Sequence, residues 1–149
     1  MTAPGVELPA LGHSDEVVRL VARFEDCTLP KAEWTHRAHL AVALWYASRL
    51  PAGEALAAIR RGIHRLNAAH GVVATQTGGY HETITRAYMQ LVGRFVDEDD
   101  ADGGWQSRVD RLLERLGERD LLLAWYSRER LMSPAARAGW VEPDLAPLP

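Results

Sequence analysis

The segment WTHRAHLAVALWYASRL, residues 34–50, decides the predicted fold. Thr35 favours the N-cap position of a helix, so we expect a helix over residues 36–50, ending before a proline. The LAVALWYA part carries no charge. A helix that is apolar on every side is buried on every side. The segment therefore predicts a central helix whose first turn delivers His36 and His39 to the interior.

Length and composition are those of one ordinary globular domain. The chain has 149 residues, 47% of them hydrophobic and 25% charged, with a net charge of −3 at pH 7. No basic surface invites nucleic acid. The single cysteine, Cys27, excludes an intrachain disulfide and a cysteine-based zinc module. Neither a signal peptide nor a run of roughly 18 apolar residues is seen, so no membrane contact and a cytoplasmic location are expected.

Further helices are expected wherever apolar residues recur at helical spacing between glycine and proline stop signals. They cover about residues 15–27, 53–70, 80–96, 104–116 and 119–132, with a short turn at 134–137. Residues 1–13 read as an irregular arm and 134–149 as a tail packed on the body. No strand pair is found. The sequence thus predicts an all-α fold: a single-domain antiparallel bundle of five to six helices with an extended C-terminal tail.

Four of the six histidines are predicted to meet at one end of this bundle. Short connections make successive helices antiparallel. His36 and His39 then open one helix, His70 closes the next, and His81 opens the one after it. All four imidazoles therefore lie near a shared end, with His36, His70 and His81 on the inward stripes of their helices.

An imidazole cluster of this kind predicts a site for a divalent transition metal: Zn, Fe, Cu or Ni. Three histidines plus an open position is the ligand set of a catalytic metal. We expect His36, His39 and His81 as ligands, His70 as fourth ligand or general base, and Glu82 as the catalytic carboxylate. The sequence thus predicts a metal-dependent enzyme, for example a hydrolase or oxygenase, acting on a small polar or anionic molecule.

Four further residues are predicted to contact the substrate: Arg37, Asn67, Tyr80 and Arg86. Two other functions remain open. A metal-free protein could bind a small anion in the same pocket, using the helix N-termini, the imidazoles and an arginine. Alternatively, the histidines could simply form hydrogen bonds in the core and at helix caps, which is the commoner role of any single histidine. The oligomeric state is left open.

The segments WTHRAHL and GYHETIT resemble a family of small bacterial helical proteins that share WTHxxHL and GYHETIT motifs. The resemblance spans roughly residues 24–96, and the segment SRERLMSPAARAGWVEPDL extends it into the tail. It implies that these segments form one unit, and it implies no particular reaction. The architecture is also similar to DinB-like metal-binding bundles, which place three histidines at a bundle end with a different spacing.

Overall fold

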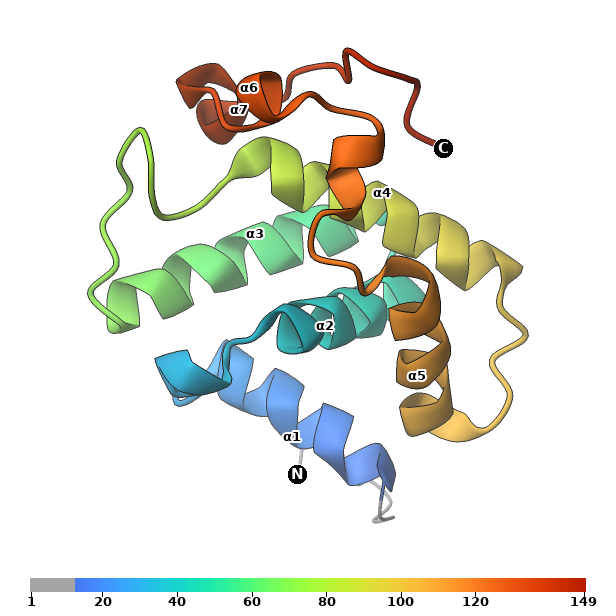
Figure 1. Cartoon of the computed structure of the whole chain (residues 1–149). Coiled ribbons are helices and arrows are strands. Elements are labelled where there is room, and N and C mark those ends of the chain that lie inside the picture. The colour runs from blue at the N-terminus through green and yellow to red at the C-terminus, as the bar shows by residue number, and fades with distance from the viewer. Residues whose placement is uncertain (1–12) are drawn as a thin grey trace.

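A computed structural model describes residues 13–149, which form seven α-helices, two short 3-10 turns and no strand (Figure 1). The α-helices are α1 (His13–Glu25), α2 (His36–Arg49), α3 (Ala52–Ala69), α4 (Glu82–Glu98), α5 (Gly104–Leu116), α6 (Arg128–Leu131) and α7 (Pro134–Ala138), and the turns are η1 (Lys31–Glu33) and η2 (Leu121–Ala124). The predicted all-α class is confirmed. Across residues 13–149, no helix is long and apolar enough to cross a membrane.

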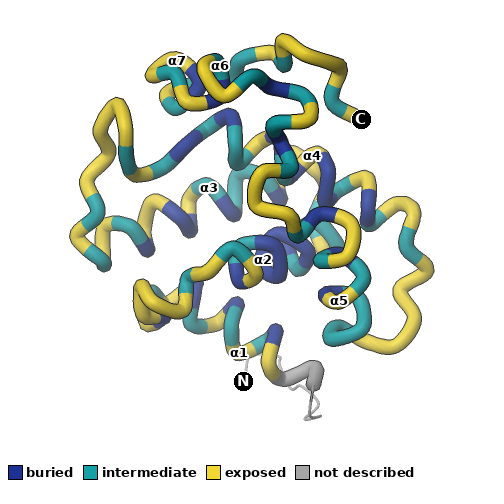
Figure 2. Tube along the Cα trace, viewed as in Figure 1, coloured by how far each residue is buried: buried dark blue, intermediate teal, exposed yellow. Residues whose placement is uncertain are grey.

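Helix α2 is the centre of the molecule, as its sequence predicts. It packs against α1, α3, α4 and α5. Half of its residues are buried (Figure 2): Ala38, Leu40, Ala41, Val42, Ala43, Leu44 and Tyr46. The predicted cap is also present, because the Thr35 hydroxyl oxygen accepts a hydrogen bond from the Ala38 N–H at 3.2 Å. This bond satisfies one of the backbone donors at the helix start and so lowers the polar cost of burying it.

Successive long helices alternate in direction, so the antiparallel arrangement is also confirmed. Helices α2 and α4 begin on the side of the molecule where α3 ends (Figure 1). Helix α5 lies across the other side and contacts α1, α2 and α4. Helices α6 and α7 and the C-terminal segment lie over the outer face of α4 (Figure 1). The start of α2 therefore faces α3 and α4 on one side and the end of α5 on another.

The prediction of one helix over residues 119–132 is wrong, because this stretch forms η2 and the single turn α6 instead. The C-terminal tail forms hydrogen bonds with backbone groups that would pair with each other in a continuous helix. The Asp144 carboxylate accepts hydrogen bonds from the Ser127 N–H at 2.8 Å and hydroxyl at 2.7 Å, and the Leu145 N–H donates to the Trp125 carbonyl at 2.9 Å. The buried Tyr126 donates its hydroxyl to the Val141 carbonyl at 2.7 Å. Tertiary bonds thus override a helical pattern.

Helix ends otherwise agree with the sequence to within a turn, and α5 matches its predicted range. His13, assigned to the irregular arm, already lies in α1; the rest of that arm lies outside the described residues. Helix α4 begins at Glu82 because His81 is its N-cap. After α7 the tail is non-helical and ends on α4, where the Gln90 amide donates to the Pro149 carbonyl at 3.0 Å.

A glycine in α3 allows α1 to approach closely. A Cβ at Gly62 would overlap the ring of Phe24, whereas the same atom at Gly93 in α4 has no neighbour within 4 Å. Phe24 cannot easily move away, since it is fully buried and stacks on Trp34 with ring centroids 4.9 Å apart.

We therefore expect Gly62→Ala and Gly93→Ala to change the free energy of unfolding in opposite directions. Overpacking against Phe24 should lower it by about 1–2 kcal/mol for Gly62→Ala, even after the gain in helix propensity. Gly93→Ala should raise it by up to about 1 kcal/mol, because only the propensity changes. Urea unfolding of both variants measures this. Equal stabilisation by the two substitutions would contradict the close approach.

Candidate functional site

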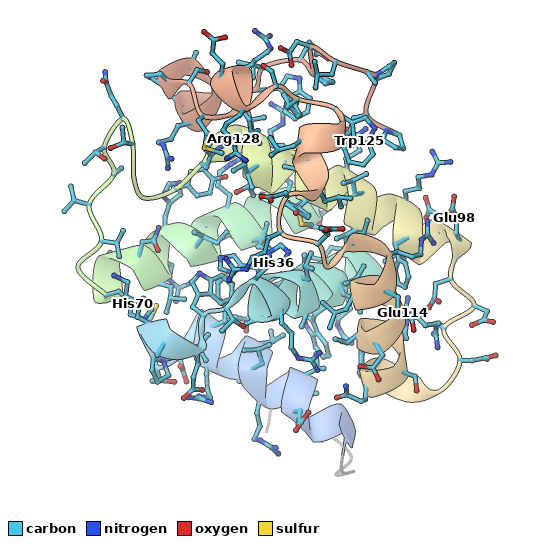
Figure 3. The ribbon with its side chains drawn as sticks, in the orientation of Figure 1. His36, His70, Glu98, Glu114, Trp125 and Arg128 are labelled. Atoms are coloured by element: carbon cyan, nitrogen blue, oxygen red, sulfur yellow. The ribbon has the colours of Figure 1, made fainter. Side chains whose placement is uncertain are left out.

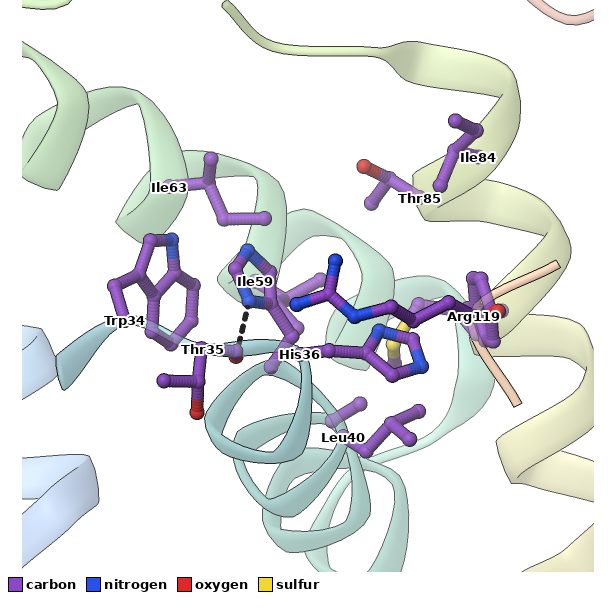
Figure 4. Close-up of a pocket in the computed structure, with 13 residues that line it drawn as sticks. Trp34, Thr35, His36, Leu40, Ile59, Ile63, Ile84, Thr85 and Arg119 are labelled. Carbon is purple, nitrogen blue, oxygen red and sulfur yellow. Dashed lines mark hydrogen bonds between the residues drawn. The ribbon is translucent and has the colours of Figure 1, made fainter. Parts of the chain in front are cut away.

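A pocket of about 380 Å³ lies between the first turns of α2, the middle of α3, the start of α4 and the loop after α5. Figure 4 shows the side chains that face it. Most of the wall is apolar: Trp34, Leu40, Ala43, Ile59, Ile63, Ile84 and Met89. The polar groups are fewer: Thr35, His36, His39, Thr85, Tyr88 and Arg119. An apolar cavity with a few converging polar groups is the usual form of a small-molecule site.

His39 is held in one tautomer by the backbone of its own helix. Its Nδ1 lies 2.7 Å from the Thr35 carbonyl oxygen and must carry the proton, because a carbonyl only accepts. Its ring stacks on Trp34, with centroids 3.8 Å apart. Burial lowers the pKa of His39, the Thr35 carbonyl raises it, and the charge of His36 lowers it, with a net decrease. The neutral ring therefore presents a basic Nε2, which can accept a hydrogen bond or a proton from a ligand.

His36 lies one turn earlier, beside Tyr88 and Arg119. Its ring meets Tyr88 edge-to-face at 5.6 Å between centroids. Burial lowers the pKa of His36, the charge of Arg119 lowers it further, and the Gly117 carbonyl raises it in part. Its Nε2 is buried and makes no hydrogen bond to the described chain. Such an unsatisfied polar atom is costly, and its presence beside a pocket marks the pocket as a candidate functional site.

Arg119 supplies a positive charge to this pocket. It follows the end of α5 at Gly117, and its guanidinium reaches over His36 (Figure 4). Within residues 13–149 it forms neither an ion pair nor a hydrogen bond. Arg111, by contrast, is held by Asp99. Arg37, Arg61 and Arg128 also lack an ion pair among the described residues, so what sets Arg119 apart is its place at the wall of this pocket. Arg119 is thus a cation facing an apolar pocket without a counter-ion among the described residues.

The other two predicted metal ligands lie elsewhere and have structural partners. The Ile84 N–H donates to Nδ1 of His81 at 3.1 Å, and Nε2 of His81 donates to the Leu131 carbonyl at 2.7 Å. Nε2 of His70 donates to the Leu29 carbonyl at 2.8 Å. Figure 3 shows His70 at the edge of the molecule, well away from His36 at its centre.

The prediction that four histidines converge on one ion therefore does not hold. In the part of the chain that the structure describes, no group of three or more His, Cys, Asp or Glu side chains could hold a metal ion. The helix ends do share one side of the bundle, as expected. However, His70 binds the Leu29 carbonyl in the loop before η1, whereas His81 binds the Leu131 carbonyl of α6, so the two rings are held by two different segments.

Glu82, the predicted catalytic carboxylate, joins α4 to α3. Arg60 donates to both of its oxygens, at 3.1 and 2.6 Å, and the Tyr80 hydroxyl donates at 2.7 Å. Burial raises the pKa of Glu82, but the Arg60 and Tyr80 hydrogen bonds outweigh it, so the pKa is lowered overall. Tyr80 and Glu82 line a separate pocket that also contains His64 and Arg137. Neither residue reaches His36.

The remaining predicted substrate residues also lie outside the His36 pocket. Arg37 is exposed and lines a smaller hollow beside α1. Arg86 stacks on Trp140, with its guanidinium carbon 4.9 Å from the ring centroid. Asn67 is half-buried near the end of α3, where its backbone carbonyl accepts a hydrogen bond from the Val72 N–H at 2.9 Å.

Sequence reasoning missed Arg119 and the role of Trp34. Arg119 is the first residue of the helix predicted over residues 119–132, and no function was predicted for it. No role was predicted for Trp34, whose ring stacks on His39 and so orients it. The charged segment GERD, residues 117–120, was only a weak indication of a site in the sequence. It comes near the histidines because α5 packs against α2, and the sequence does not predict that contact.

His81 provides a direct test of its structural role. We expect His81→Ala to lower the free energy of unfolding by about 2 kcal/mol, because it removes the cap of α4 and leaves the Leu131 carbonyl unpaired. His64→Ala, at an exposed position on α3 where the ring contacts Tyr80 at 4.3 Å between centroids, is the control and should lower it by less than about 1 kcal/mol. Chemical unfolding measures both. Equal losses of stability in the two variants would contradict the capping role of His81.

The same residue predicts a pH dependence. Burial lowers the pKa of His81 below its ordinary value of 6.5, despite the hydrogen bond to the Leu131 carbonyl. The unfolded chain therefore binds more protons, so the His81 contribution to stability is complete above about pH 6.5 and declines as the pH falls below it. We expect His81→Asn, which can still cap, to lose less stability than the native chain between about pH 7 and pH 5. Identical losses would contradict a neutral His81.

Neither a protein-family model nor a curated protein nor a solved structure matches this chain significantly. Membership of the family that the WTHxxHL and GYHETIT segments resemble therefore stays a prediction. A functional assignment depends on the chemistry of the pocket itself.

Proposed function

We propose that this protein binds a small organic anion, a carboxylate on an apolar body, in the pocket at the start of α2. The observation that carries the proposal is Arg119. Its guanidinium lies over a mostly apolar cavity beside His36 and has no counter-ion within residues 13–149. A ligand with one negative group and one apolar group complements both features.

The size and lining of the pocket suit such a ligand. A volume of about 380 Å³ is within the range of small-molecule sites. Ile59 and Ile63 of α3 line it together with Leu40 and Ala43 of α2. An aromatic or branched aliphatic group enclosed there would be removed from water, which favours binding by roughly 25 cal/mol per Å² of apolar surface.

The charged end of the ligand is expected at Arg119. A guanidinium is charged at every physiological pH and binds carboxylates through two parallel hydrogen bonds. The lowered pKa values of His36 and His39 keep these rings neutral, so they act as hydrogen-bonding groups and add no charge. His39 offers Nε2 as an acceptor for a donor on the ligand.

Metal-dependent catalysis, the other function that the histidines predict, stays a prediction. His36 and His39 are the two imidazoles that still share a pocket. Metal content of the tag-free protein, together with Zn²⁺ titration, tests it. Stoichiometric metal lost in both His36→Ala and His39→Ala would favour metal binding over the anion site proposed here.

The binding experiment compares phenylpropionate with its uncharged analogue phenylpropionamide by titration calorimetry. We expect phenylpropionate to bind and Arg119→Gln to raise its Kd at least about tenfold, because a charge-assisted pair is lost. Arg37→Gln is the matched control, since Arg37 is exposed near the start of α2 but lines a different hollow. The Kd of phenylpropionate for this variant should stay unchanged.

A second variant tests the apolar compartment. Ala43→Leu places extra volume at the wall of the cavity, so it should weaken phenylpropionate binding. Ala43 is also buried in the core, so the thermal midpoint of the free variant is measured alongside to separate filling of the cavity from overpacking. Two results would refute the proposal: equal binding of the acid and the amide, or equal effects of Arg119→Gln and Arg37→Gln.

A further inference from the structure

A smaller compartment of about 160 Å³ adjoins the main pocket. The two cavities share four side chains, those of His36, Ile84, Tyr88 and Arg119. The smaller one extends past the shared wall to Asp120 and to residues of η2 and α6. A ligand held at Arg119 therefore lies between an apolar compartment and a second compartment that contains a carboxylate.

Asp120 is an acid without a structural role in the described chain. It occupies the N-cap position of η2, but its side chain makes no capping hydrogen bond. It also forms no ion pair among residues 13–149, and it is exposed. Burial, together with the negative charge of Asp120, raises the pKa of Tyr88 to about 12. The carboxylate therefore acts on the Tyr88 hydroxyl at the shared wall.

Arg119 and Asp120 are adjacent and opposite in charge, yet they do not pair with each other. The Arg119 charge acts on His36, and the Asp120 charge acts on Tyr88. The rings of His36 and Tyr88 meet at 5.6 Å between centroids. A positive and a negative group thus flank one ring pair, and a ligand that carries both charges on neighbouring atoms can satisfy both.

From this juxtaposition we infer that the ligand is an α-amino acid with a large apolar side chain. Its carboxylate pairs with Arg119, its ammonium group with Asp120, and its side chain enters the apolar compartment. This inference rests on the proposed function and narrows it, since an α-amino acid is a carboxylate on an apolar body with one added ammonium group.

The apolar compartment sets the size of the side chain. Trp34, Ile59, Ile63 and Met89 line the part of the pocket away from Asp120. A methyl side chain leaves this surface uncovered, while an aromatic or branched aliphatic group covers it. We therefore expect phenylalanine and leucine to bind and alanine to bind at least about tenfold more weakly, since several methylene equivalents of burial are lost.

Arg128 also lines the smaller compartment and supports a competing ligand. Two arginines and one aspartate could instead hold a dicarboxylate, which would leave the Asp120 charge unpaired. Phenylsuccinate, with two carboxylates on an apolar body, is the probe for that possibility.

The test measures the Kd of phenylalanine, phenylpropionate and phenylsuccinate by calorimetry on the full chain. We expect phenylalanine to bind about tenfold more tightly than phenylpropionate, because the ammonium group gains a charged partner. Asp120→Asn should abolish that advantage and leave phenylpropionate within about twofold of its native Kd. Glu118→Gln removes a neighbouring exposed acid that lines neither compartment, so the advantage should persist.

The outcomes separate this inference from the proposed function. Two results would contradict the amino acid as ligand while leaving the proposed organic anion possible. In the first, phenylpropionate binds as tightly as phenylalanine. In the second, Asp120→Asn still binds phenylalanine more tightly than phenylpropionate. Tighter binding of phenylsuccinate than of phenylalanine overturns it in favour of a dicarboxylate. Failure of all three ligands overturns both. Unchanged unfolding midpoints of the variants show that any loss arises at the site.

Discussion

Burial of the middle of α2, residues 40–44, on all sides is the constraint from which the rest of the structure follows. This apolar stretch leaves no face for water, so α1, α3, α4 and α5 pack around it. The N-terminus of α2 then has to emerge among the ends of those neighbours. Thr35 satisfies one of the free N–H groups there, that of Ala38, and the first turn carries the two histidines. A polar helix start enclosed by apolar neighbours is what creates the pocket.

The histidines illustrate how similar helix positions lead to different roles. His81 uses both ring nitrogens to join the start of α4 to α6, and His70 ties the end of α3 to the Leu29 carbonyl. Both of these rings bind backbone groups and have a structural role. His36 and His39, by contrast, each leave Nε2 without a hydrogen-bond partner in the described chain, next to Arg119. The nitrogens left free, rather than the number of histidines, distinguish the candidate site.

The fold was predictable from the sequence wherever local signals and burial agree. The cap at Thr35, the apolar stretch after it and the range of α5 follow from residue patterns alone. The predicted helix over 119–132 failed because Asp144 and Val141, far along the chain, bind its backbone and side chains. Arg119 was missed for a related reason. A loop arginine has no periodic pattern, and its place over His36 depends on how α5 crosses α2.

The most direct measurement is the response of each histidine ring to the ligand in nitrogen–proton correlation spectra. The ring resonances of His36 and His39 should shift together and saturate as phenylpropionate is added, since both rings line the pocket. Those of His70 and His81 should stay in place, because their nitrogens are bound to backbone groups elsewhere. Saturable shifts at His70 and His81 with none at His36 and His39 would contradict a binding site at the start of α2.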